Sequence, residues 1–145
     1  MAKKLLSLQD NMKTVLTIGV FDLLHIGHVE LFRKARALGD RLVVAVQDSD
    51  YILKYKPEAK TVGSTEERAY MVKAVKYVDD IVIYTDAETV MDLCDFDILA
   101  AGPDQNHSGF QKLFSWCRAN GKQVVILPRT DGISTTELKE HIKAL

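Results

Sequence analysis

The stretch that decides the fold is "TVLTIGVFDLLHIGHVELFRKARALGDRLVVAVQ", residues 14–47. Its two ends, 14–21 and 41–47, are strand-length apolar runs, and the residues between them carry apolar side chains at helical spacing. Both runs are continuously apolar, which is typical of strands covered on both faces. A strand, a helix and a second strand in this order predict a parallel βαβ unit with a right-handed crossover.

The alternation of strands and helices continues along the rest of the chain. Further strands are expected at 79–84, 97–102 and 123–128, and further helical segments at 64–75, 87–94, 109–121 and 134–145. Gly39 and Gly121 are placed as C-terminal helix caps. Ser64 and Ser134 open S-x-x-E capping boxes. We therefore predict an α/β fold: a Rossmann-like, doubly wound parallel five-stranded sheet with helices on both faces, in a single domain.

The composition is that of a globular protein of one domain. The chain has 145 residues, of which 47% are hydrophobic and 27% charged. The formal net charge of −1 gives no global attraction to nucleic acid or to an anionic membrane, so neither is expected as a partner. No apolar run approaches the roughly 20 residues of a membrane span, so no membrane insertion is expected. Cytoplasmic is the expected location.

Residues 1–11 are expected to be a flexible N-terminal extension of a domain that covers 12–145. Met12 begins "MKTVL", which would serve equally well as a start. The apolar stretch before it is too short for a signal sequence. Cys94 and Cys117 lack a C-x-x-C pattern and lie in apolar segments, so we expect buried free thiols.

The chemically rich segments all follow expected strands. "FDLLHIGH" comes after the first strand, "DSDYILKYK" after the second, "GPDQNH" after the fourth and "RTDGISTT" after the fifth. The carboxyl ends of parallel strands share one edge of a sheet, and ligands bind there where the winding direction reverses. We therefore expect a single ligand site at this edge.

The segment 25–28 reads H-I-G-H and lies at the mouth of the first expected helix. Gly19 and Gly27 allow a ligand to approach the backbone closely, and the free N–H groups of a helix start favour an anion. His25 and His28 can donate hydrogen bonds to the oxygens of a phosphate. The residue pattern alone leaves two alternatives open, a metal site completed by Asp22 and a structural role.

Two further segments are suited to phosphate. Lys54 and Lys56 are expected in an extended loop after the second strand, where side chains two residues apart face the same way. Arg129 stands at the exit of the last strand, with Ser134 as the N-cap of the last helix and Thr135 beside it. A solvated loop and a capped helix are the alternatives for the two segments, but neither explains why both lie at one edge.

The pairing of "GVFDLLHIGH" (19–28) with "RTDGISTT" (129–136) resembles the cytidylyltransferase family of the HxGH nucleotidyltransferases, and within it the glycerol-3-phosphate enzymes. "KYVDD" (76–80) resembles the family's R-Y-V-D-E, and the likeness covers 14–145. The resemblance implies an enzyme that transfers CMP from CTP to a small phosphorylated alcohol or polyol, for example glycerol phosphate, and releases pyrophosphate. Members of the family are commonly homodimers.

The resemblance also implies roles for individual residues. The catalytic residues would be His25, His28, Lys54, Lys56 and Arg129. The nucleotide would be bound by Gly19, Val20, Phe21, Gly27, Lys76, Gly102, Asp104, Thr130, Ser134 and Thr135. Asp22 would help to hold Mg²⁺ through the phosphates of the nucleotide.

The chain departs from the family pattern at three places. Val20 stands where Thr is usual, and Lys76 replaces an Arg, so a hydroxyl and a planar bidentate group are lost. "GPDQNH" (102–107) stands where the glycerol-phosphate enzymes have G-D-D-W, which makes His107 either an extra acceptor ligand or part of a surface loop. These departures leave two alternative functions open. One is an adenylyltransferase acting on a sugar phosphate or flavin mononucleotide, and the other is a catalytically weak nucleotide-binding module.

Overall fold

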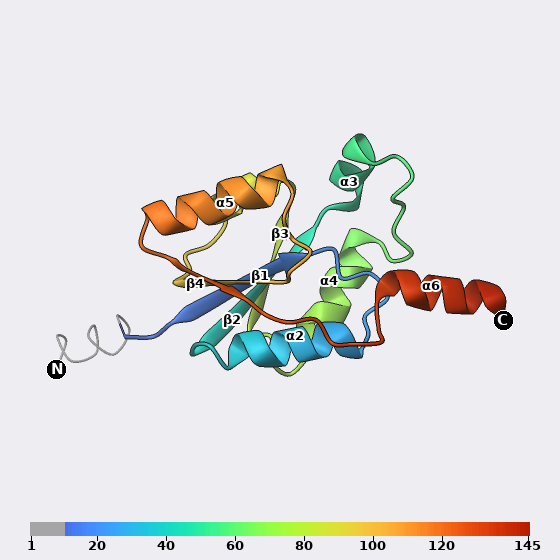
Figure 1. Ribbon diagram of the computed structural model, residues 1–145, viewed down its shortest axis with the longest axis horizontal. Helices are drawn as coiled ribbons and strands as arrows, with labels where there is room; N and C mark the ends of the chain where they lie inside the picture. The colour runs from blue at the N-terminus through green and yellow to red at the C-terminus, as the bar shows by residue number, and fades with distance from the viewer. Residues whose placement is uncertain (1–10) are drawn as a thin grey trace.

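The computed structural model describes residues 11–145, in which strands and helices alternate (Figure 1). The elements are β1 Thr14–Gly19, α2 Ile26–Arg36, β2 Arg41–Gln47, α3 Ser49–Tyr55, α4 Thr65–Lys73, β3 Asp80–Tyr84, the 3₁₀ helix η1 Ala87–Asp92, β4 Ile98–Ala101, α5 Ser108–Ala119, β5 Gln123–Ile126 and α6 Thr135–Ala144. The extension expected at 1–11 falls almost entirely outside the described residues. Within them, none of the helices combines the length and hydropathy needed to cross a bilayer.

The five strands form one all-parallel sheet in the order β3-β2-β1-β4-β5. The chain winds from β1 outward through β2 and β3, then returns to the other side of β1 for β4 and β5. This is the doubly wound arrangement that the sequence predicts, and the winding direction reverses between β1 and β4. The carboxyl ends of these two strands therefore mark the expected crevice.

Each face of the sheet has its own core. Val15, Val44 and Val72 belong to the cluster beneath α2 and α4, on one face. Leu16 and Leu99 belong to the cluster beneath η1 and α5, on the opposite face (Figure 1). Val15 and Leu16 are adjacent in β1 and point to opposite faces, as neighbours in a strand must. Helices on both faces explain why the strands are continuously apolar.

Three local predictions differ from the structure: the loop expected after β2, the helix expected at 87–94 and the helix cap expected at Gly39. The segment expected as a loop after β2 begins with helix α3, in which Asp48 is the N-cap and only Ile52 is buried. Seven residues with one buried side chain are too few to give a readable period. The helix expected at 87–94 is the short 3₁₀ helix η1. Gly121 has the positive φ of 70° expected after a helix, but the C-cap of α2 is Ala37 and not Gly39.

Gly39 is required for a different reason from capping. A Cβ atom at this position would lie 2.7 Å from the carbonyl oxygen of Lys13. Of the two thiols, Cys117 is buried and Cys94 is partly buried, and both are free as expected.

Candidate active site

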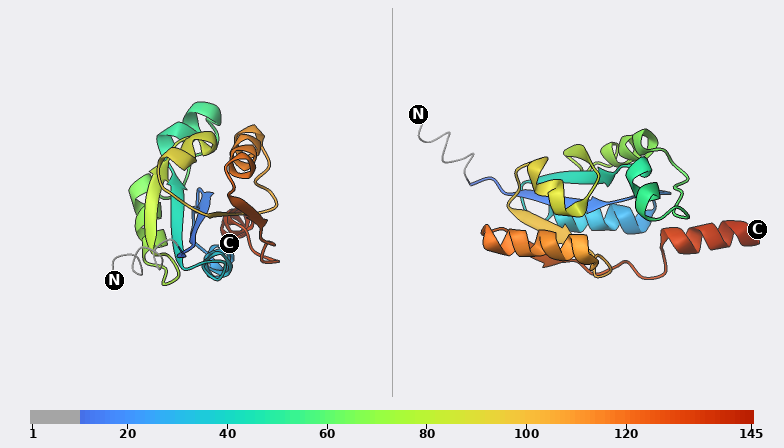
Figure 2. Two further views of the ribbon diagram at one scale, coloured as in Figure 1. Left: turned by 90° about the vertical axis from the view of Figure 1, so that its left-hand side faces the viewer. Right: turned by 90° about the horizontal axis from the view of Figure 1, so that it is seen from above.

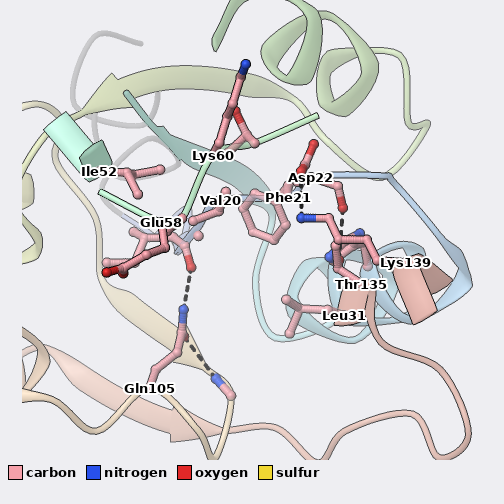
Figure 3. Close-up of a pocket in the computed structure, with 16 residues that line it drawn as sticks. Val20, Phe21, Asp22, Leu31, Ile52, Glu58, Lys60, Gln105, Thr135 and Lys139 are labelled. Carbon is pink, nitrogen blue, oxygen red and sulfur yellow. Dashed lines mark hydrogen bonds and ion pairs between the residues drawn. The ribbon is translucent and has the colours of Figure 1, made fainter. Parts of the chain in front are cut away.

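Three cavities join into one groove along the carboxyl ends of the strands. The central cavity, about 460 Å³, is lined among others by Val20, Asp22, His28, Lys60, Gln105 and Lys139 (Figure 3). The α6 cavity, about 270 Å³, is lined among others by His25, Gly27, Asp104, Arg129, Ser134 and Thr135. The β3-side cavity, about 520 Å³, is lined among others by Tyr51, Lys56, Tyr84, Asp86, His107 and Phe110. The central cavity shares His28 and Thr135 with the second and Val20 and Ala59 with the third.

The two histidines of H-I-G-H form a capping box at the start of α2. His25 is the N-cap, and its Nδ1 accepts the N–H of Gly27 at 3.0 Å. The Nδ1 of His28 accepts the N–H of His25 at 3.3 Å, and the two rings stack with their centroids 3.8 Å apart. Because both Nδ1 atoms accept, each neutral ring carries its proton on Nε2. The pair therefore presents two Nε2–H donors at a helix start that already favours an anion.

Burial keeps these rings uncharged near neutral pH. It lowers the pKa of His28 from 6.5 to about 4, with a smaller contribution from the neighbouring His25. Burial and the charge of Arg129 lower the pKa of His25 as well. The pair consists of hydrogen-bond donors and not of cations.

The backbone around the histidines is closely packed and partly strained. A Cβ atom on Gly27 would lie 2.7 Å from Cε1 of His25. Phe21 and Leu23 have positive φ values of 54° and 50°, which are costly for residues with a side chain. Phe21 is buried, and its ring meets that of His28 edge-on at 5.4 Å between centroids. The strained turn thus fixes the position of the His28 ring.

Asp22 joins the H-I-G-H segment to two other parts of the chain. Its carboxylate, 5% exposed, accepts the N–H of Val62 at 2.8 Å and that of Gly63 at 2.9 Å. Lys139 Nζ of α6 lies 3.5 Å from the same carboxylate, and Thr135 Oγ1 donates to the carbonyl of Asp22 at 2.9 Å. Burial raises the pKa of Asp22, but the hydrogen bonds from Gly63 and Val62 and the charge of Lys139 outweigh it, so this pKa lies below its ordinary value.

Arg68 and Gln105 are two polar anchors of the site that the sequence analysis missed. Arg68 of α4 is 3% exposed and donates hydrogen bonds to two backbone carbonyls. The carbonyl of Val20, just after β1, accepts at 2.7 Å, and that of Gln47, the last residue of β2, accepts at 2.8 Å. Its spacing of four residues from the buried Val72 is the signal that could have found it. Gln105 donates from Nε2 to the carbonyl of Ile18 at 2.7 Å (Figure 3). No pattern in the sequence marks Gln105.

The basic residues expected at the site are spread along the groove. Arg129 lines the α6 cavity and pairs with Asp104 at 2.7 Å, both side chains being largely exposed. Lys56, the C-cap of α3, lines the β3-side cavity, and Lys60 lines the central one. Lys54 lies in the last turn of α3, so it does not share a face with Lys56 as an extended loop would allow, and it lines none of these cavities.

The structure places the remaining predicted nucleotide contacts as follows. Gly19, Val20 and Phe21 line the central cavity, Thr130 lines the α6 cavity, and Gly102 lines both. Lys76 lies just before β3, at the amino ends of the strands and away from the groove at their carboxyl ends. Its Nζ lies 5.1 Å from the ring centre of Tyr77. Within residues 11–145 no cluster of three or more His, Cys, Asp or Glu side chains could hold a metal ion. A phosphate-binding groove fits the arrangement better than a protein-built metal centre.

Comparisons with known proteins agree with this site. The family model described as cytidylyltransferase-like matches residues 16–141. The chain is 39% identical to glycerol-3-phosphate cytidylyltransferase from Bacillus subtilis over 137 residues, which cover 92% of this chain and 100% of that protein. It is 34% identical to FAD synthase from Thermococcus kodakarensis, with 88% of this chain and 90% of that protein covered.

A solved structure shares the fold of this chain. The lipopolysaccharide core biosynthesis protein from Thermoplasma volcanium superposes with a TM-score of 0.67 at 26% identity, over 82% of this chain and 97% of that one. The parallel sheet, the H-I-G-H capping box and the R-T-D-G-I-S-T-T segment thus occur together in a chain that matches one family over most of its length. The protein is a nucleotidyltransferase that belongs to the cytidylyltransferase-like family.

Proposed function

We propose that this enzyme transfers CMP from CTP to a small phosphorylated alcohol or polyol and releases pyrophosphate. The observation that carries the proposal is the stacked pair of His25 and His28, which line the groove at the start of α2 and keep their Nε2–H groups free of the helix cap. The similarity to a glycerol-3-phosphate cytidylyltransferase along its whole length supports cytidine as the base.

The reaction needs positioning and charge neutralisation. A phosphate oxygen of the acceptor attacks the α-phosphorus of CTP, and the bond from that phosphorus to the bridging oxygen of the leaving pyrophosphate breaks. A phosphomonoester is already anionic near neutral pH, so no general base is required. Donors fixed in advance where negative charge develops lower the barrier of such phosphoryl transfers.

Each group of side chains has a part in this scheme. His25 and His28 would donate to the non-bridging oxygens that gain charge in the transition state. Arg129, Ser134 and Thr135 would hold the triphosphate in the α6 cavity, together with the free N–H groups at the start of α6. Lys56 would attract the phosphate of the acceptor, with Lys54, which lines none of the three cavities, adding positive charge from the last turn of α3.

The nucleotide would lie across the switch point between β1 and β4. We infer that the backbone of Gly19, Val20, Phe21 and Gly27 and that of Gly102 lines its path, with Asp104 and Thr130 near the ribose. Asp104 is paired with Arg129, so the nucleotide has to share or replace that ion pair. Lys76 lies at the amino ends of the strands, so it could contact a nucleotide only in the groove of a second chain. Such a contact fits the homodimer that we expect.

Enzymes of this family use a divalent metal ion, and we propose Mg²⁺. It would neutralise charge on the triphosphate and the leaving pyrophosphate. The described residues form no metal cluster, so the phosphates would supply most of the ligands. Asp22 is the buried carboxylate beside the histidines, and the lone pairs that its backbone partners leave free would order the hydrated ion.

The experiment is pyrophosphate release by the purified chain with Mg²⁺, CTP or ATP in turn, and a set of phosphorylated alcohols and sugars. We expect CTP-dependent turnover and a CDP-linked product identified by mass. Turnover with ATP alone would overturn the proposal in favour of adenylyl transfer, which the similarity to an FAD synthase makes the second candidate. Light scattering would test the expected homodimer independently.

A further inference from the structure

Apart from Lys56 and Val20, the residues of the β3-side cavity have no part in the chemistry described so far, although at about 520 Å³ the cavity is larger than the central one. The two share Val20, Ile52 and Ala59, so they lie next to each other. Under the proposed function, on which this inference rests, the phosphate of the acceptor must reach the nucleotide in the central cavity. The carbon chain of the acceptor can then extend into the β3-side cavity.

The floor of this cavity is largely apolar and buried. It is formed by Tyr84, Ala87 and Phe110, which are 3%, 5% and 6% exposed. Tyr51 and Tyr55 form one wall, with their ring centres 4.9 Å apart. An apolar floor with a few fixed polar groups is the usual construction of a small-molecule site.

A carboxylate is fixed at the edge of this floor. Tyr51 donates its hydroxyl to Asp86 Oδ2 at 3.0 Å, and Asp86 Oδ1 accepts the N–H of Glu88 at 3.1 Å as the N-cap of η1. Each oxygen keeps a lone pair for a further donor, and the hydroxyl oxygen of Tyr51 can accept as well. The pair can therefore accept hydrogen bonds from two neighbouring hydroxyl groups of a ligand.

A donor lies close to the same carboxylate: a Cβ atom on Gly109 would lie 3.1 Å from Cε1 of His107 and 3.5 Å from Oδ1 of Asp86. His107 is the N-cap of α5, and its Nδ1 accepts the N–H of Gly109 at 3.2 Å. The neutral ring therefore carries its proton on Nε2, as His25 does in the same local arrangement. His107 thus supplies the donor that Asp86 and Tyr51 lack.

The remaining charges of the lining are partly paired. Glu88 pairs with Lys112 at 2.9 Å, and the other two charged side chains are Asp86 and Lys56, the latter assigned to the phosphate of the acceptor. Uncharged hydroxyl groups, each both donor and acceptor, match the fixed acceptors of Asp86 and Tyr51 and the donor of His107.

The size of the cavity bears on the length of the carbon chain. At about 520 Å³ it falls in the range of roughly 300–1,000 Å³ that small-molecule sites occupy. A longer hydroxylated chain would contact more of its polar groups than a three-carbon alcohol. We propose that the β3-side cavity binds the hydroxylated carbon chain of an alditol or sugar phosphate longer than glycerol phosphate, with Asp86 and His107 as the specificity-determining residues.

The test compares acceptors of increasing length on the full chain with CTP and Mg²⁺. Glycerol 3-phosphate, a four-carbon and a five-carbon alditol phosphate and a hexose phosphate are assayed by pyrophosphate release. We expect kcat/KM to rise about tenfold or more from the three-carbon acceptor to the best longer one, while KM for CTP stays within about twofold. A highest kcat/KM for glycerol 3-phosphate would overturn the inference and leave the proposed function standing.

Two variants test whether the β3-side cavity determines the preference for the acceptor. Asp86→Asn keeps the N-cap of η1 but removes the charge, and we expect it to reduce kcat/KM about tenfold for the longer acceptor with little effect on glycerol 3-phosphate. Asp92→Asn removes a charge from an exposed position of the same 3₁₀ helix, outside the cavity, and is the matched control. Equal kinetics of both variants with every acceptor would overturn the inference. Absence of turnover with CTP and every acceptor would instead overturn the proposed function, and the inference with it.

Discussion

His28 is the residue in which fold and chemistry meet most directly. It caps α2 through Nδ1, packs on the rings of His25 and Phe21, and keeps Nε2–H for the groove. One imidazole thus does the work that a capping glutamate does in other helices and also supplies a donor. Because the ring is buried in order to make both contacts, its pKa is lowered and it is harder to protonate.

We expect His28→Ala to lower kcat about 100- to 1,000-fold, because one preorganised donor to a developing charge is lost. KM for CTP should change by less than about threefold, since the contact strengthens only in the transition state. Steady-state kinetics measure both, and circular dichroism checks the fold. His141→Ala, in the exposed last turn of α6, is the control. Near-normal kcat in a folded His28→Ala protein would rule out this role.

Acid should destabilise the protein through the same ring. The pKa of His28 is 6.5 in the unfolded chain and about 4 in the folded one, so the unfolded state binds more protons between these pH values. The free energy of unfolding should therefore fall as the pH drops from 6.5 to 4, by about 3 kcal/mol from this residue. Urea titrations measure the slope. In His28→Gln, which keeps a capping acceptor, most of the slope should disappear, and an unchanged slope would contradict the assignment.

At the scale of elements, the site depends on side chains that join segments far apart in the chain. Arg68 of α4 binds the backbone at the ends of β1 and β2, and Asp22 links the H-I-G-H turn to residues 62–63 and to α6. Each contact satisfies carbonyl or N–H groups that have no partner in a strand or helix. The carboxyl edge of the sheet is held in shape by these links.

Arg68→Met should lower the free energy of unfolding by about 3 kcal/mol, because several buried carbonyl groups lose their donor at once. Arg118→Met, at an exposed position of α5, should stay within about 0.5 kcal/mol and serves as the matched control. Chemical denaturation of both variants gives the comparison. Equal stability of the two would show that Arg68 is not the anchor that its contacts indicate.

Thr135→Val removes the hydroxyl that attaches α6 to the carbonyl of Asp22 and that lines the groove. We expect KM for CTP to rise about three- to tenfold, since a hydrogen bond contributes about 1 kcal/mol and the start of α6 is less well placed without it. Thr136→Val is the neighbouring control with an exposed side chain. The same KM in both variants would place Thr135 outside the nucleotide site.

At the scale of the whole molecule, the sequence predicts the sheet well because each strand is a continuous apolar run. It predicts the H-I-G-H and R-T-D-G-I-S-T-T segments at one edge because parallel strands end together. It misses α3, where only Ile52 is buried, and it misses Gln105, which binds a carbonyl 87 residues away. A contact of this kind depends on the assembled fold and leaves no local pattern.

Helix α6 extends beyond the rest of the domain, and none of its residues is buried (Figure 2). Its opening as a separate unit costs little free energy because few apolar contacts are lost. The N-terminus of this helix carries Ser134 and Thr135, so a nucleotide that binds them stabilises the closed helix by mass action. Amide exchange in α6 should slow with increasing CTP concentration, and an unchanged exchange rate would contradict this coupling. Binding of the substrate thereby shifts the local unfolding equilibrium of α6 toward the folded helix.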